Sequence, residues 1–515
     1  MSSNLRQATR AQGTRRRSVT TAIVLALFIS LIAAASAAAR AQVNIVSQGT
    51  PPSKIPANTH YFKTIQEAVN ASTTPGDFVL IEPGVYKEEV KVTSAESGIY
   101  IRGMNRNTVI LDGQHKVGNG IDIVRANDVW VENLTVRNYE FGEGCSDEEC
   151  GNGVWWDGRG SGKPIGAHGW YGDYLTAYDT GMKGGYGIFA NSETEGEFNH
   201  IYASGYADSG FYIGACQECD GLVRNAVMEN NSLGYSGSNA GGKLIIEKST
   251  FAHNAVGFAT NSENPGDPPP PQDGECNRPE VPSTSTPTIT STNIPRCTIL
   301  RYDSFTENNN LSVPPNGSTE IAPWGVGVEL PGDYADLVAH NTISGNANVG
   351  VLGFEYPNPF PVPPFCENPE GCGTIDFQFA GNRISQNTFS NNGYNPGPLG
   401  GALAGDVTML SGSGEFLDEN YGFTYPPAQS VDNCLTANHF ADATYPANIE
   451  HTWHCSHATT PNPGGGELGV AYLIGLIEES AFIRSETPPV GQPEPAEQTT
   501  MPNPCAGVPR NPLCT

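Results

Sequence analysis

The sequence predicts an all-β chain that winds into a parallel β-helix, a solenoid of three sheets with about ten rungs. Short apolar runs that open on a glycine recur at an almost constant interval, since Gly187, Gly210, Gly234 and Gly257 are 23, 24 and 23 residues apart. Asparagine-rich turns separate the runs, and 60 glycines and 40 prolines argue against a chain of long helices. A fixed period of this length is typical of a solenoid.

The repeat unit indicates how the chain winds. Each period holds three short runs of strand character, such as VWVENLTV, LIIEKSTF and LVAHNTIS. Asparagines follow them, at Asn230 and Asn231, Asn254, Asn308 to Asn310, and Asn391 and Asn392. A unit this short cannot bury its own apolar face and must stack on its neighbours. The fixed leucines of a leucine-rich repeat are missing, so we expect parallel sheets whose stacked asparagine side chains hydrogen-bond along the axis.

The N-terminal segment resembles a secretory signal peptide. Residues 1–41 contain six arginines and no acidic residue, and an apolar run at 19–39 precedes the small-residue cleavage pattern Ala39-Arg40-Ala41. We expect a secreted or cell-surface protein. A retained membrane anchor is the alternative, because the apolar run is long enough to span a bilayer.

The elements that follow are expected in a simple order. Residues 42–60 would be an N-terminal extension, and residues 61–460 the β-helix. Thr64 and Glu67 form a capping-box pattern for a short helix with Ile65, Ala68 and Val69 on one side, suited to capping the open end of the solenoid. Residues 461–484 would close the other end, and residues 485–515 would be a solvated Pro-rich tail with a small disulfide loop.

The charge of the mature chain restricts its partners. Without residues 1–41 it keeps 21 of its 27 basic residues against 54 acidic ones, a net charge of −33. Such a surface repels nucleic acid and anionic lipid. It also disfavours a polyuronate, unless a divalent cation such as Ca²⁺ bridges the like charges.

Twelve cysteines in an exported chain predict disulfides between sequence neighbours. The expected pairs are Cys145 with Cys150, Cys216 with Cys219, Cys276 with Cys297, Cys366 with Cys372, Cys434 with Cys455, and Cys505 with Cys514. Two alternatives are a redox role for Cys216 and Cys219, and a zinc site that combines them with Cys145 and Cys150. His451, His454 and His457 have a spacing that could serve a metal on a helix, but Cys455 in a disulfide argues against that helix, and we expect no metal site there.

A family resemblance supports this interpretation. The stretch TIQEAVNASTTPGDFVLIEPGVYKEEVKV, followed by VILDGQ and GIDIVRANDVWVENLTVRNY, resembles the first segment of right-handed parallel β-helix proteins of the pectin-lyase-like superfamily. NSLGYSGSNAGG and DSGFYIGACQECDG are similar to secreted bacterial β-helix repeat proteins of unassigned activity. The resemblance covers residues 61–457 and implies a right-handed parallel β-helix. It specifies the fold far better than the function.

Strand alternation predicts which side chains face the core. The residue after each opening glycine should point inward, which places in the core Val154, Ile188, Phe211, Phe258, Val326 and Val351. The next residue should face solvent, so Trp155, Phe189 and Tyr212 would line up on successive rungs as an aromatic strip that could bind sugar rings. The alternative is that loops cover these rings. Long insertions at 140–152, 159–172, 262–297 and 357–374 flank the same sheet, and the superfamily uses this arrangement to bind polysaccharide.

Residues near that strip are the catalytic candidates. They are Asp157, His168, Asp173, Asp179 and Lys183, with Asn191 and Arg159 beside them. Glycoside hydrolysis needs two carboxyl groups, whereas a uronate lyase needs a base and calcium. The motifs of polygalacturonases and alginate epimerases are absent as sets. We therefore expect a monomeric protein that binds a polysaccharide or cell-surface glycan, either as a polysaccharide lyase or glycoside hydrolase or as a non-catalytic surface or matrix structural or adhesion protein.

Overall fold

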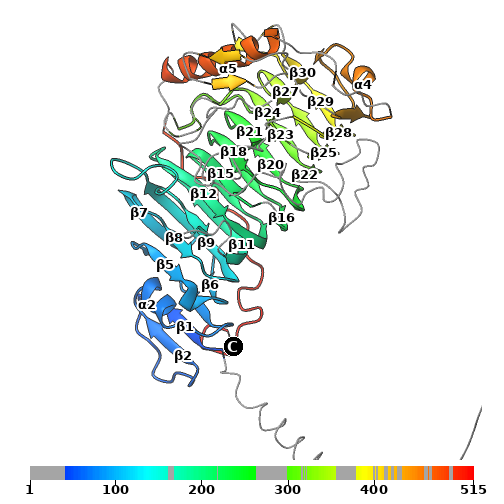
Figure 1. The fold of residues 1–515 in the computed structure, drawn as a ribbon. Helices are drawn as coiled ribbons and strands as arrows, with labels where there is room; N and C mark the ends of the chain where they lie inside the picture. Colours follow the sequence, from blue (N-terminus) through cyan, green and yellow to red (C-terminus); the bar gives the residue numbers. More distant parts are fainter. Residues whose placement is uncertain are drawn as a thin grey trace, which may run out of the picture. The chain divides into compact units, whose positions relative to one another are not determined.

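The computed structural model describes most of the chain after the predicted signal peptide (Figure 1). The described residues are 41–159, 167–216, 219–261, 298–314, 317, 319, 322–333, 335–354, 379–397, 401, 404–410, 416–418, 423–425, 432–456, 462, 467–486 and 491–514. The predicted signal peptide, residues 1–41, lies outside them apart from Ala41. In these ranges, none of the helices combines the length and the apolar character that crossing a membrane requires.

One parallel sheet, here called sheet 1, runs through the described chain from the N-terminal to the C-terminal rungs. Its strands, in sheet order, are β5 (Val90–Thr93), β8 (Ile121–Val124), β10 (Val154–Asp157), β12 (Gly184–Asn191), β15 (Tyr206–Gly214), β18 (Leu233–Ser238), β21 (Val256–Asn261), β24 (Val326–Pro331), β27 (Val349–Phe354), β30 (Gly405–Met409) and β34 (Thr444–Tyr445). Each strand pairs only with the strands one turn before and after it, as a solenoid requires.

Two further parallel ladders, sheets 2 and 3, complete each turn. Sheet 2 contains β2 (Thr59–Phe62), β1 (Val43–Val46), β3 (Phe78–Ile81), β6 (Tyr100–Gly103), β13 (Glu193–Asn199), β16 (Gly221–Arg224), β19 (Leu244–Glu247), β22 (Thr298–Arg301), β25 (Leu337–Ala339), β28 (Arg383–Ser385) and β33 (Cys434–Thr436). Sheet 3 contains β4 (Gly84–Tyr86), β7 (Val109–Val117), β14 (Tyr202–Ser204), β17 (Val227–Glu229), β20 (Thr250–Ala252), β23 (Ser304–Thr306), β26 (Thr342–Ser344) and β29 (Thr388–Ser390). The long strands β9 (Val129–Glu140) and β11 (Ala167–Tyr178) bend and belong to both.

The chain visits sheets 1, 2 and 3 in turn, as in the run β15, β16, β17 and β18, and each turn stacks on the previous one. Inward side chains of all three sheets form a single apolar core along the axis, with Trp156, Phe211, Phe258 and Phe305 among its largest members. The predicted parallel β-helix is therefore confirmed.

The inward row follows the predicted rule with one exception. Val154, Ile188, Phe211, Phe258 and Val351 are buried in the central core. Val326 is buried as well, but in a separate cluster on the outer face of sheet 1.

The exception has a simple cause. Val328 takes the inward position in β24, because it pairs with Phe258 and Val351. The stretch GVGVE offers two opening glycines, and Gly327 rather than Gly325 aligns with the glycines of adjacent rungs.

Stacked asparagines connect the rungs at the turn from sheet 3 to sheet 1. The side-chain amide of each donates to the side-chain oxygen of the next, at 2.9 to 3.1 Å, in the series Asn231, Asn254, Asn308, Asn346, Asn392, which ends on Asp406. The backbone N–H of the first four donates to the same oxygens. All of these side chains are buried. The predicted asparagine ladder is confirmed.

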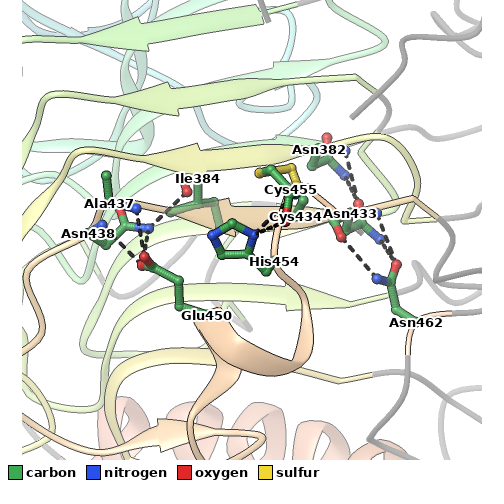
Figure 2. Close-up of a disulfide and its surroundings, with 11 residues drawn as sticks. Asn382, Ile384, Asn433, Cys434, Ala437, Asn438, Glu450, His454, Cys455 and Asn462 are labelled. Carbon is green, nitrogen blue, oxygen red and sulfur yellow. Dashed lines mark hydrogen bonds between the residues drawn. A yellow bond between two sulfur atoms is a disulfide. The ribbon is translucent and has the colours of Figure 1, made fainter. Parts of the chain in front are cut away.

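Two shorter ladders occupy the other corners. Asn341, Asn387 and Asn438 stack between sheets 2 and 3, where Asn438 donates to Glu450. Asn382, Asn433 and Asn462 stack between sheets 1 and 2, and Figure 2 shows this series, together with Asn438 and Glu450 of the first, near the Cys434–Cys455 disulfide. At each of the three corners, these asparagines thus satisfy buried turn N–H groups with side-chain oxygens from the next rung.

Asn346→Ala should destabilise the protein by about 2–5 kcal/mol, because it removes the acceptor of two Asn308 N–H groups in a buried site. Asn309→Ala is the matched control, since the Asn309 amide donates to Tyr394 Oη near the surface. The control should change stability by less than about 1 kcal/mol. Urea unfolding followed by circular dichroism would measure both, and equal effects would contradict a special role for the ladder.

The N-terminal end differs from expectation in one respect. Helix α2 (Ile65–Asn70) carries the predicted capping box of Thr64 and Glu67 and buries Ile65, Ala68 and Val69. Residues 42–60, however, are not an extension outside the solenoid. β1 pairs in parallel with both β2 and β3, so this segment supplies the first strand of sheet 2.

The C-terminal end also differs. Helix α4 (Ile449–Thr452) leads into Trp453, which is fully buried and accepts a backbone hydrogen bond from Leu435 on the last strand of sheet 2. Helix α5 (Glu467–Glu486) was expected to close the coil. Instead, Leu476 packs with Val256, Val349 and other apolar residues on the outer face of sheet 1, and Ser480 accepts a hydrogen bond from the Trp324 N–H. The described chain also contains an antiparallel pair, β31 (Phe416–Asp418) with β32 (Phe423–Tyr425), and a 3₁₀ turn at Ser94–Glu96.

The Pro-rich tail is not solvated, which corrects the sequence-based prediction. Residues 491–514 run back along the solenoid to its first rungs, and the C-terminus lies beside β1 in Figure 1. Arg102 donates to the carbonyls of Pro504 and Ala506 at 3.1 and 2.7 Å, and Arg106 donates to that of Thr499 at 3.0 Å. The two arginines are buried, with 5% and 2% of their surface exposed, and need hydrogen-bond acceptors that the tail supplies. The composition of the tail does not report this need, because the arginines lie far away in the sequence.

Four of the six predicted disulfides lie among the described residues. They are Cys145–Cys150, Cys216–Cys219, Cys434–Cys455 and Cys505–Cys514, so the redox and zinc alternatives are wrong for these cysteines. The pairs Cys276–Cys297 and Cys366–Cys372 lie outside the described residues. The four bridges fit an extracytoplasmic protein.

Removal of residues 491–515 should loosen the N-terminal rungs selectively. Val508 and Leu513 pack on the cluster around Phe78 and Leu80, and the tail hydrogen bonds would be lost with them. We expect hydrogen exchange in β1, β3 and β6 to accelerate at least about tenfold. Exchange in β22 and β25 serves as the internal control and should stay unchanged. Uniform or unaltered protection would contradict this role of the tail.

Candidate active site

The predicted aromatic row exists, but it is covered. Trp155 pairs with Phe189, and Phe189 with Tyr212, in consecutive strands of sheet 1. Their ring centroids are 5.1 and 5.0 Å apart. The prediction that they face solvent is wrong, since the three side chains are only 4%, 4% and 6% exposed. Their proposed contact with sugar stays an untested prediction and would require the cover to move.

The cover comes from side chains near the rings in sequence and from one disulfide loop. The Tyr186 ring stacks 4.1 Å from that of Phe189, and the Arg159 guanidinium lies 4.6 Å above the Trp155 ring. Trp155 Nε1 also donates to Asn191 Oδ1 at 3.0 Å. The disulfide loop of Cys145 and Cys150 passes directly over the start of β12, because its carbonyls lie against Gly185.

Two carboxyl groups stand at the N-terminal end of this row. Asp122 on β8 is the cross-strand partner of Trp155, and Asp157 on β10 is the partner of Val124. The two aspartates therefore occupy diagonal positions on one face of neighbouring strands, about 7–8 Å apart at the backbone. Their side chains are 23% and 14% exposed, so both reach solvent.

The two carboxyl groups have different surroundings. Burial raises the pKa of Asp122 to about 6, although Lys91 lies 3.9 Å away and opposes the shift. Asp122 Oδ1 has no hydrogen-bond partner. Asp157 Oδ1 instead accepts from Arg159 Nε at 3.1 Å and from the Arg159 backbone N–H at 2.9 Å. Burial thus favours the protonated form of Asp122 despite its distant ion pair with Lys91, whereas Asp157 is held by a closer ion pair and a backbone hydrogen bond.

A third carboxyl group lies behind this pair. Glu193 at the start of β13 is 1% exposed, and neither of its carboxyl oxygens has a hydrogen-bond partner. Its side chain packs against Gly158, next to Asp157. Burial, with the nearby Asp157 charge, raises the pKa of Glu193 well above its ordinary value. Burial therefore favours the protonated form of Glu193.

The other catalytic candidates do not join Asp157. His168 is at the start of β11 in sheet 2, with Nδ1 at 3.5 Å from Asp128. Asp173 lies at the turn from sheet 2 to sheet 3, where burial raises its pKa to about 7 and His200 is 3.4 Å away. Asp179 and the exposed Lys183 belong to the turn that precedes β12, and Asp179 accepts the Lys183 backbone N–H. His168, Asp173 and the turn that holds Asp179 and Lys183 therefore lie at three different corners of the solenoid.

A second carboxyl cluster, not anticipated from the sequence, is closed to solvent. Glu329 on β24 is in the same outward row as Asp122, but it is buried, and burial raises its pKa to about 8. Asp333 follows it, is also buried, and accepts a hydrogen bond from Thr260. Asp336 accepts the Thr298 backbone N–H at 2.9 Å. This cluster lies deep in the protein and offers no open binding surface among the described residues.

Asp122 was missed, although a signal was available. It is the second residue after Gly120, so the rule that placed Trp155 in the outward row also places Asp122 there. Glu193, by contrast, carries no such pattern. Its burial depends on how tightly the turn at Gly158 packs against it, which the local sequence does not encode.

The histidines near the C-terminus lie at the last rung. His454 Nδ1 is 2.7 Å from Ser456 Oγ, and α4 ends at Thr452, so the helix that would align the histidines ends before His454. Figure 2 shows His454 next to the Cys434–Cys455 disulfide. His457 lies outside the described residues.

Comparison with known proteins finds only distant similarity to solved structures. No family model and no curated protein matches the chain. Among solved structures, the A-module of a mannuronan C-5 epimerase from Azotobacter vinelandii is 14% identical, with 73% of this chain and 90% of that chain covered and a TM-score of 0.38. An alginate lyase from Paenibacillus is 11% identical, with 74% and 93% covered and a TM-score of 0.32. A family 28 exopolygalacturonase from Yersinia enterocolitica is 11% identical, with 79% and 73% covered and a TM-score of 0.33.

All three are below 25% identity to this chain and below a TM-score of 0.5. The likeness concerns the fold alone.

The buried Glu329 predicts how stability depends on pH. Its pKa is about 8 in the folded protein and near its ordinary value of 4.5 in the unfolded chain, so the folded state binds the extra proton between these values. The stabilisation is complete below pH 4.5 and is lost as the pH rises toward 8. We expect the melting temperature to fall between pH 5 and pH 8.5, and Glu329→Gln to reduce that fall. Glu307→Gln, at a side chain 63% exposed, is the control and should leave the profile unchanged. An identical profile for both variants would refute the assignment.

Proposed function

We propose that this protein binds a polysaccharide on the outer face of sheet 1 over β5, β8 and β10, and hydrolyses a glycosidic bond there with Asp122 and Asp157. The observation that supports this most directly is the position of the two carboxyl groups. They stand on adjacent strands of one face and both reach solvent, but Asp122 Oδ1 has no hydrogen-bond partner, whereas Asp157 Oδ1 accepts two hydrogen bonds from Arg159.

The chemistry of glycoside hydrolysis asks for such an unequal pair. One carboxyl group must protonate the leaving oxygen, and the other must act as a carboxylate, either on water or on the sugar. Asp122, with its raised pKa, is suited to be the acid. Asp157, with Arg159 and a backbone N–H on its oxygen, is suited to be the carboxylate.

The rest of sheet 1 supports this location. Farther along the row, Ala259 and Leu352 pack with Leu476 of α5, which leaves no open face there in the described chain. Lys91 and Arg159, with side chains 62% and 43% exposed, flank the aspartates. The net charge of −33 for the mature chain favours a neutral polysaccharide, or an acidic one that Ca²⁺ bridges.

Replacement of either aspartate should abolish hydrolysis. Asp122→Asn and Asp157→Asn should each lower kcat/KM by at least about 100-fold, because each removes one proton-transfer or carboxylate function. Asp128→Asn, at a side chain 50% exposed on sheet 2, is the control and should retain activity. The measurement is the appearance of new reducing ends on a panel of polysaccharides, with and without calcium.

The pH profile provides a further check on Asp122. A general acid works only in its protonated form, so kcat/KM should fall as the pH rises through about 6. Unsaturated ends in place of reducing ends would indicate a lyase. Retention on polysaccharide without any product would remove the enzyme proposal and favour the non-catalytic surface or matrix protein.

A further inference from the structure

Three side chains from consecutive turns converge at the corner between sheets 3 and 1, away from the aspartate pair. They are His115 on β7, Glu140 at the end of β9 and Asp179 directly after β11. His115 Nδ1 is 2.8 Å from Glu140 Oε1 and 3.7 Å from Asp179 Oδ1. One nitrogen and two carboxylate oxygens therefore lie within 4.8 Å of one another.

The backbone is shaped to bring His115 into this group. The pairing of β7 with β9 shifts its register between Asp112 and Lys116. Gln114 and His115 both adopt left-handed conformations there, with φ of 58°. Such a bulge redirects the side chain of its extra residue. Glu140 and Asp179, which belong to the two following turns, lie next to the redirected His115 side chain.

Gly181 encloses the group. A Cβ at this position would lie 2.1 Å from Glu140 Oε1 and 2.8 Å from His115 Nδ1, so only glycine leaves the space between the three side chains free. The exposure of the side chains falls from 46% for His115 to 13% for Glu140 and 0% for Asp179. The group is therefore buried at Asp179 and open to solvent at His115.

The group of His115, Glu140 and Asp179 contains more acidic than basic side chains. Two carboxylates face one imidazole, and Asp179 already uses its oxygens to accept the backbone N–H groups of Gly181, Lys183 and Gly184. These donors hold Asp179 in place, but they bring no positive charge. Among the described residues, no ammonium or guanidinium is ion-paired with Glu140 or Asp179.

We propose that His115 Nδ1, Glu140 Oε1 and Asp179 Oδ1 bind a divalent transition-metal ion of the Zn²⁺ type. Zn²⁺ binds such ligands at about 2.0–2.2 Å in a tetrahedral arrangement, which places ligand atoms about 3.3 Å apart. The observed separations of 2.8 and 3.7 Å bracket that value. A nitrogen ligand with so few oxygens fits a transition metal better than Ca²⁺, which takes six to eight oxygens.

The ion has a structural consequence that does not depend on the proposed hydrolysis. Glu140 is the last residue of β9 and leads into the loop that Cys145 and Cys150 close. A metal that joins Glu140 to β7 and to the turn before β12 would fix the base of this loop. The solvent-exposed side of His115 leaves a fourth coordination position for water.

The test is metal titration of the mature protein after dialysis against a chelator. Isothermal calorimetry with Zn²⁺ should give one site per chain, and Co²⁺ should give visible absorption bands of a tetrahedral centre. His115→Ala and Glu140→Gln should each weaken affinity at least about tenfold. His115 is half exposed, so its variant is expected to fold, and circular dichroism would verify this.

The matched control is His253→Ala. His253 has the same left-handed backbone, with φ of 56°, a similar exposure of 47%, and a carboxylate, Glu307, at 3.5 Å. It belongs to no group of three ligands among the described residues. This variant should bind Zn²⁺ like the unaltered protein. Absence of a stoichiometric site, or a site that survives in His115→Ala, would overturn the proposal.

Discussion

In-register stacking of parallel strands is the constraint on which the rest of this structure depends. Each turn lies directly on the previous one, so a residue has its counterpart one rung away as its neighbour. Backbone hydrogen bonds set the spacing, and buried asparagines at the corners fix the lateral position, because their amides find acceptors only when successive turns coincide. Surface rows, including the row that begins at Lys91 and Asp122, inherit this register.

The fold could be predicted because the same register leaves a period in the sequence. Glycine-opened runs and corner asparagines gave the three sheets, the ladder and the alignment of Trp155, Phe189 and Tyr212. The inward residue of the stretch GVGVE was ambiguous, because both Gly325 and Gly327 could be the glycine that opens the run. Exposure could not be predicted, since strand alternation does not report that Arg159 and Tyr186 lie over the rings or that the Cys145–Cys150 loop lies against Gly185.

The candidate site was predictable only in part for the same reason. Asp157, and in retrospect Asp122, follow from strand alternation. The pKa of Asp122 and the isolation of Glu193 depend on packing by neighbouring turns, which no local pattern reports. The tail is the extreme case. Its composition indicates a solvated segment, whereas its path is decided by Arg102 and Arg106, about 400 residues earlier, which require carbonyl acceptors.

A single outward row of sheet 1 has one end that is buried under α5 and another end that solvent reaches. Along it the residues change from Lys91 and Asp122, through three rings, to Ala259 and Leu352. The apolar end suits the cover that α5 provides, and carboxyl groups trapped there, such as Glu329, become neutral acids. The polar end keeps partial access to water, so its carboxyl groups can exchange protons with solvent. The position of the proposed catalytic surface therefore follows from where the cover of the solenoid ends.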